Sequence, residues 1–66
     1  MNTTVEELET ELQEVLLNID AIAQKVSNKE IDAYAGFIES EKYKNRVVEI
    51  GNILKEKGID ITTRTE

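Results

Sequence analysis

The chain of 66 residues contains no cysteine, histidine, tryptophan or proline, and it has only three glycines and three aromatic residues. Without cysteine no disulfide can form, and without cysteine and histidine the commonest zinc ligands and activators of a nucleophile are missing. Carboxylates are plentiful, but carboxylates on the outer side of a helix with no histidine beside them do not form a di-metal site. We therefore predict a non-enzymatic protein with no catalytic residue, no cofactor and no metal site.

Long apolar runs and glycine-rich motifs are also missing. No segment approaches the roughly 18 apolar residues of a membrane span, and the N-terminus lacks a basic segment followed by an apolar run. The glycines at positions 36, 51 and 58 match neither the dinucleotide-binding spacing nor the P-loop spacing. These absences predict a cytoplasmic protein that contacts no membrane and binds no small-molecule substrate.

Basic charge is scarce in the first third of the chain. The formal net charge is −6, and residues 1–24 contain six acidic residues but no Lys or Arg, whereas residues 25–66 contain eight of each sign. Because nucleic acids and most membrane surfaces are anionic, their binding to the first third would add repulsion where attraction is needed. Nucleic acid is therefore disfavoured as a partner.

The first third instead carries an apolar residue at every third or fourth position. These residues are Val5, Leu8, Leu12, Val15, Ile19, Ile22 and Val26. Their spacing predicts a helix over about 4–26 that packs against another helix, and Thr4 with Glu7 has the spacing of a capping box that starts it. Leu16 and Ala23 widen the apolar stripe beyond the seam of a two-stranded coiled coil, which favours a helical hairpin or bundle.

A second helical region is predicted over about 28–57. Ser27 and Glu30 repeat the capping-box spacing, which predicts a second helix that begins at Ser27 after a short connection. Short connections join antiparallel neighbours, so we expect the two helical regions to lie side by side in opposite directions.

The apolar pattern of this second region is divided. Ile31, Tyr34, Ala35 and Ile38 share one face, and Tyr43, Val47, Ile50 and Leu54 share another that is rotated by roughly 120°. We therefore favour a break near 36–42, where Gly36 lowers helix propensity and Ser40 can cap a third helix. A continuous helix with two different partners along its length is the alternative, because no proline forces a break.

The C-terminal end of the second region has a clear stop signal. Gly58 stands where a left-handed residue ends a helix, Lys57 lies near the negative end of the helix dipole, and Ile59 can fold back on Leu54. We expect the last helix to stop at Lys57 and residues 59–66 to form a C-terminal arm that is partly mobile.

The predicted fold class is all-α: one small domain over 1–66, built as an antiparallel helical hairpin or a small three-helix bundle. A chain this short buries only about 60% of its unfolded surface, and neither a disulfide nor a zinc site is available as a staple. We therefore expect oligomerisation to complete the fold.

The predicted contact residues fall into two sets. The first is the apolar stripe from Val5 to Val26, expected to pack on a second helix or a second copy. The second set holds candidate exposed contacts, namely Glu7, Glu11, Glu14, Leu17, Tyr34, Phe37 and Tyr43. Tyr34, Phe37 and Tyr43 are the predicted hot spot, because aromatic side chains are enriched at protein interfaces.

The leading functional hypothesis is an acidic interaction module, acting as a regulator, adaptor or inhibitor that binds a partner protein through a helix face. A second hypothesis is an inhibitor whose acidic helix mimics nucleic acid in the basic channel of an enzyme. A third is a structural subunit of an assembly, and a fourth is a weak DNA-binding regulator that acts through Lys42 to Arg46. Frequent Lys, Glu, Ile and Asn favour a bacterial, phage or mobile-element source.

Overall fold

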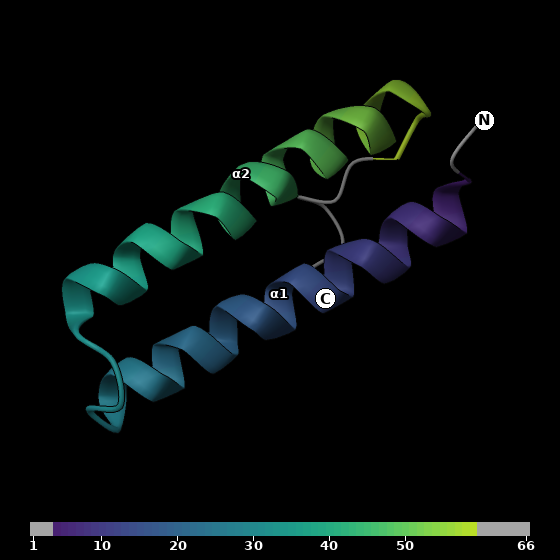
Figure 1. The fold of residues 1–66 in the computed structure, drawn as a ribbon. Coiled ribbons are helices and arrows are strands. Elements are labelled where there is room, and N and C mark those ends of the chain that lie inside the picture. The colour runs from purple at the N-terminus through teal and green to yellow at the C-terminus, as the bar shows by residue number, and fades with distance from the viewer. Residues whose placement is uncertain (1–3, 60–66) are drawn as a thin grey trace.

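Two antiparallel α-helices make up the fold in a computed structural model that describes residues 4–59 (Figure 1). Helix α1 spans Val5–Ser27 and helix α2 spans Ala33–Glu56. Figure 1 shows the helices side by side, joined at one end by residues 28–32. The predicted all-α hairpin is confirmed, and the described part of the chain contains no β-strand.

The predicted capping box at the start of α1 is confirmed. The Thr4 hydroxyl accepts a hydrogen bond from the Glu7 backbone N–H at 3.1 Å, and the Glu7 carboxylate accepts one from the Thr4 backbone N–H at 2.9 Å. These bonds satisfy two of the backbone N–H groups that a helix start leaves free. Glu6 and Glu7 also lie at the positive end of the helix dipole, so both the capping hydrogen bonds and the charge–dipole interaction stabilise the start of α1.

The predicted start of the second helix at Ser27 is wrong. Ser27 lies in the last turn of α1, and α2 is capped by Asp32, whose carboxylate accepts a hydrogen bond from the Tyr34 backbone N–H at 3.1 Å. The chain must reverse direction between the helices, and Lys29 does so in the left-handed region with φ 63°. A helix that began at Ser27 would leave no residues for this reversal.

The predicted break near 36–42 is also wrong, because α2 runs without interruption from Ala33 to Glu56. Gly36 and Ser40 are both buried. A Cβ on Gly36 would overlap the Cγ2 methyl of Val26 and would be in ordinary contact with Cγ2 of Ile22 at 3.5 Å. Ser40 caps no helix, and its hydroxyl donates to the Phe37 carbonyl oxygen at 3.1 Å. Small side chains therefore let the two helices approach closely here, and no third helix exists in residues 4–59.

The most deeply buried part of the core lies at the opposite end of the hairpin. Leu8, Ile50 and Leu54 are at most 1% exposed, and each such burial contributes about 1.5–3 kcal/mol. The residues of α2 that face α1 recur at intervals of three and four positions. They are Gly36, Ser40, Tyr43, Val47, Ile50 and Leu54.

The predicted stop signal after α2 is confirmed. Gly58 has φ 90°, in the left-handed region that glycine tolerates, and the Ile59 backbone N–H donates to the Leu54 carbonyl oxygen at 2.9 Å. Ile59 also packs on the cluster formed by Leu8, Ile50 and Leu54. Residues 60–66, the greater part of the predicted C-terminal arm, lie outside the described residues.

Candidate protein interaction surface

A shallow groove of about 290 Å³ runs between the helices near their connection. It is lined by Ile19, Ile22, Ala23, Val26, Ala33, Gly36, Phe37, Ser40 and Lys44. Ile22, Gly36 and Ser40 are buried and form the floor, whereas Ala23, Phe37 and Lys44 are exposed and form the rim. Gly36 and Ser40 place little side-chain bulk on this floor, where the two helices approach closely.

Large apolar side chains stand along the same side of the hairpin as this groove. Leu16 precedes Ile19 by one helical turn, and Val48 follows Phe37 by eleven residues, or about three turns. Leu16 is 49% exposed, Phe37 55% and Val48 61%. We call this surface the groove face; its members are Leu16, Ile19, Ala23, Ala33, Phe37 and Val48.

The apolar stripe of α1 is only partly covered by α2. Leu8, Val15 and Ile22 are buried, and the other four residues of the predicted stripe are half-buried. Leu16 and Ala23, the residues that widen the stripe, are exposed. Helix α2 therefore packs on one side of the stripe, and the remaining side forms part of the groove face.

Glu7, Glu11 and Glu14, the acidic candidate contacts, form a row along α1, and a bond to α2 engages its middle member. Glu7 and Glu14 are exposed, but the two carboxylate oxygens of Glu11 accept hydrogen bonds from Nε and Nη2 of Arg46, each at 2.7 Å. Arg46 also contacts Glu49 at 3.3 Å through Nη1. The hydrogen bonds from Arg46 hold the pKa of Glu11 below its ordinary value. Glu11 is thus both a member of the row and a link between the helices.

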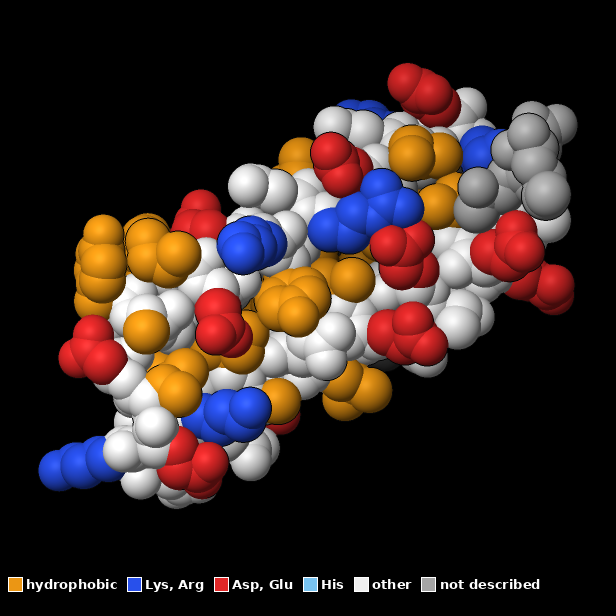
Figure 2. Space-filling view, in the orientation of Figure 1, with side chains coloured by type: hydrophobic (Ala, Val, Ile, Leu, Met, Phe, Trp, Pro, Cys, Tyr) orange, Lys and Arg blue, Asp and Glu red, His pale blue; other side chains and the backbone are white. Residues whose placement is uncertain are grey.

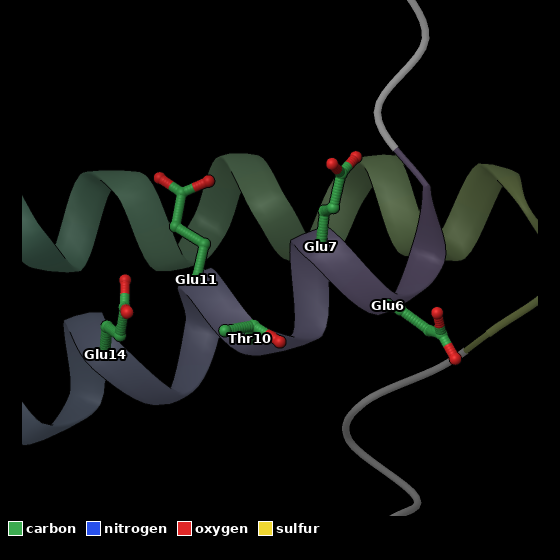
Figure 3. A pocket seen from close by; sticks show the side chains of 5 residues that line it. All are labelled: Glu6, Glu7, Thr10, Glu11 and Glu14. Atoms are coloured by element: carbon green, nitrogen blue, oxygen red, sulfur yellow. The ribbon is translucent and has the colours of Figure 1, made fainter.

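Figure 3 shows how the acidic side chains of α1 are spread. Glu6, Glu7, Glu11 and Glu14 surround Thr10 in a shallow hollow, and the Glu6 side chain points away from those of Glu7 and Glu11. Within residues 4–59, no three acidic side chains are grouped so that they could hold a metal ion. The row is therefore a line of separate charges.

The predicted aromatic hot spot is distributed over different surfaces. Phe37 lies on the groove face, and Tyr43 is half-buried on the side of α2 that faces α1. Tyr34 is 72% exposed in the first turn of α2. Leu17, the other exposed candidate, is 68% exposed and lies outside the apolar stripe. On the face shown in Figure 2, apolar side chains gather near the connection, and acidic side chains lie along the whole length of the hairpin.

The basic segment from Lys42 to Arg46 is largely engaged by acids. Lys44 contacts Glu41 at 3.9 Å, and its Nζ lies 5.9 Å from the centre of the Phe37 ring. Lys44 is thus paired with Glu41, and Arg46 is paired with Glu11, within the hairpin. The sequence indicates the pairs within α2 through their spacing of three residues, but the bond between Arg46 and Glu11 links positions 35 residues apart.

Sequence reasoning missed three features of this surface: the buried Gly36 and Ser40, the bond between Glu11 and Arg46, and the exposed Val48. The bond between Glu11 and Arg46 could have been predicted from the register of the hairpin, because a short connection determines which residues of the two helices lie opposite each other.

No known family matches the chain, and no curated protein or solved structure is significantly similar to it. Between Thr4 and Ile59, neither helix combines the length and the apolar content that crossing a membrane requires.

Proposed function

We propose that this protein is a non-enzymatic interaction module of the cytoplasm that binds another protein chain through its groove face. The observation that carries this proposal is the groove face, where Leu16 of α1 and Phe37 and Val48 of α2 are about half exposed on the side of the hairpin that holds the groove. Scattered apolar residues are ordinary on a surface, whereas a contiguous apolar patch marks a binding site.

The groove face has the composition of a protein contact. Phe37 supplies a large aromatic side chain at its centre, Leu16 and Ile19 supply aliphatic area, and Lys44 supplies charge at the rim. Apolar side chains with a polar rim are typical of protein interfaces. Full burial of a large apolar side chain contributes about 1.5–3 kcal/mol, and these side chains are about half covered already, so each would add roughly half of that on binding.

The competing functions have less support. The acidic mimic of nucleic acid depends on the row Glu7, Glu11 and Glu14, and Arg46 neutralises the middle member of that row. The DNA-binding regulator depends on Lys42 to Arg46, and two of the bases in that segment already contact acids. A structural subunit would use the same groove face, so it is a special case of the proposal.

The proposal is tested by a light-activated crosslinking amino acid placed at position 16 or, as a matched control, at position 17. Leu16 and Leu17 are adjacent residues of the same type, but only Leu16 belongs to the groove face. Irradiation of the producing cells is expected to give a protein adduct from position 16 and much less from position 17. The absence of any adduct from position 16, or equal adducts from both positions, contradicts the proposal.

A further inference from the structure

We propose that the groove face binds a second copy of this chain, so that two hairpins form a four-helix bundle in which α1 of each copy packs on α2 of the other. This inference rests on the proposed function and names its partner. It follows from the size of the fold, the area of the face and the distribution of charge between the helices.

The hairpin by itself has a small core. The buried apolar side chains of residues 4–59 are Leu8, Val15, Ile22, Ile50 and Leu54. A chain of this length buries only about 60% of its unfolded surface, so its stability is marginal, and without cysteine it cannot add a disulfide. A second hairpin on the groove face would cover Leu16, Phe37 and Val48 in both copies and turn two helices into a four-helix core.

The area of the face fits such a contact. Helix α2 has 24 residues, so it is about 36 Å long. Two neighbouring helices present a face about 20 Å wide, which gives an area of about 700 Å². A specific interface buries about 800 Å² on each partner, so the whole side of the hairpin that carries the groove face is close to the area that a stable dimer requires.

The charges decide how the second copy is oriented. Helix α1 carries six acidic residues and one Lys, a net charge of −5, whereas α2 carries four of each sign and is neutral. Packing α1 on α1 of the second copy would bring two strongly acidic helices within 8–10 Å. A two-fold axis parallel to the helices places α1 on the neutral α2 of the second copy instead.

This orientation specifies a contact. Phe37 and Ile19 line the same groove, so they lie at the same height along the hairpin. A two-fold axis parallel to the helices preserves height, so Phe37 of one copy meets α1 of the second copy between Leu16 and Ala23. The Phe37 ring is therefore the centre of the dimer contact.

Size-exclusion chromatography with light scattering tests the second copy directly. At micromolar concentration we expect twice the chain mass of 7.5 kDa for the native sequence and for Tyr34→Glu, whose side chain lies outside the groove face. Phe37→Glu is expected to raise the Kd of the dimer by about tenfold or more. A native chain that remains monomeric overturns the proposal, whether or not Phe37→Glu folds.

Chemical crosslinking tests the orientation. Leu16→Cys and Phe37→Cys, prepared separately and mixed, each offer one thiol to a short bifunctional maleimide. We expect the product that joins position 16 of one copy to position 37 of the other, and a predominant link between two positions 16 overturns the packing of α1 on α2. If the chain is monomeric but position 16 crosslinks to a different protein in cells, the second copy is excluded and the proposed function stands. If position 16 gives no protein adduct at all, the proposed function also fails.

Discussion

The effect of Gly36→Ala on stability should depend on the residue at position 26. The substitution should destabilise the chain when Val26 is present and stabilise it when Val26 is replaced by Ala. In an otherwise unstrained helix, Gly→Ala raises stability by up to about 1 kcal/mol. Here the new Cβ would overlap the Cγ2 methyl of Val26, and overpacking of this kind costs about 1–3 kcal/mol. We therefore expect Gly36→Ala to lower the free energy of unfolding by up to about 2 kcal/mol.

Removal of the methyl groups of Val26 should relieve the overlap. In a Val26→Ala background, the nearest remaining side-chain atoms are Cγ2 of Ile22 at 3.5 Å and Cδ1 of Ile31 at 3.6 Å, which are ordinary contacts. Gly36→Ala should then stabilise the chain by up to about 1 kcal/mol. The coupling between the two substitutions is expected to be about 1–3 kcal/mol.

Urea unfolding followed by far-UV circular dichroism, at one fixed protein concentration, measures this cycle with four proteins. The Val26→Ala variant alone is the control. The effect of Gly36→Ala in this variant is compared with its effect in the native chain, so the packing lost by Val26→Ala itself cancels. If Gly36→Ala stabilised both backgrounds equally, the two helices would not approach closely at Gly36, and the explanation for the uninterrupted α2 would be refuted.

Three further substitutions test other parts of the hairpin. Thr4→Ala removes the capping box and should lower the free energy of unfolding by about 1 kcal/mol in urea titrations; no change would mean that the cap contributes nothing. Leu54→Ala should cost about 2–5 kcal/mol, a large share of the stability of so small a chain, and a circular dichroism spectrum and urea midpoint like those of the native sequence would contradict the assigned core. Arg46→Gln should raise the pKa of Glu11 toward its ordinary value of 4.5 in an NMR titration. The pKa of Glu11 is lower in the folded chain than in the unfolded chain, so ionised Glu11 stabilises the folded chain fully at neutral pH. This stabilisation is lost as the pH falls below about 4.5 and through the folded pKa. In Arg46→Gln this part of the loss of stability in acid should disappear.

The ends of the hairpin could be predicted because their signals are local. Thr4 and Glu7 satisfy each other's backbone N–H groups within one turn, and Gly58 with Ile59 closes α2 within a few residues. The start of α2 was wrongly placed at Ser27, although Asp32 is an equally good cap residue. The chain needs several residues between the helices to reverse direction, which excludes Ser27 as the start of α2. No single residue type indicates how many residues the reversal needs.

The middle of α2 could not be predicted by counting apolar residues. The side that packs on α1 there consists of Gly36 and Ser40, which an apolar count ignores, so Tyr34 and Ile38 wrongly suggested a rotated core. Close approach of two backbones uses small residues, and their burial depends on the partner helix.

The candidate site was only partly predictable for a similar reason. The bidentate bond between Glu11 and Arg46 joins the two helices, so it depends on the register that the connection sets. The sequence identified the apolar stripe of α1, and its widening by Leu16 and Ala23 favoured a hairpin over a two-stranded coiled coil. Which side stays open is decided by the position of α2.

The most direct test of the central claim, that the groove face is a protein contact, is thiol labelling at positions 16 and 17 in intact cells. The chain has no cysteine, so Leu16→Cys and Leu17→Cys each introduce a single thiol. In an isolated hairpin these side chains are 49% and 68% exposed, so their thiols should react at similar rates. We predict that the thiol at position 16 reacts several-fold more slowly than the thiol at position 17, and equal rates would contradict the claim.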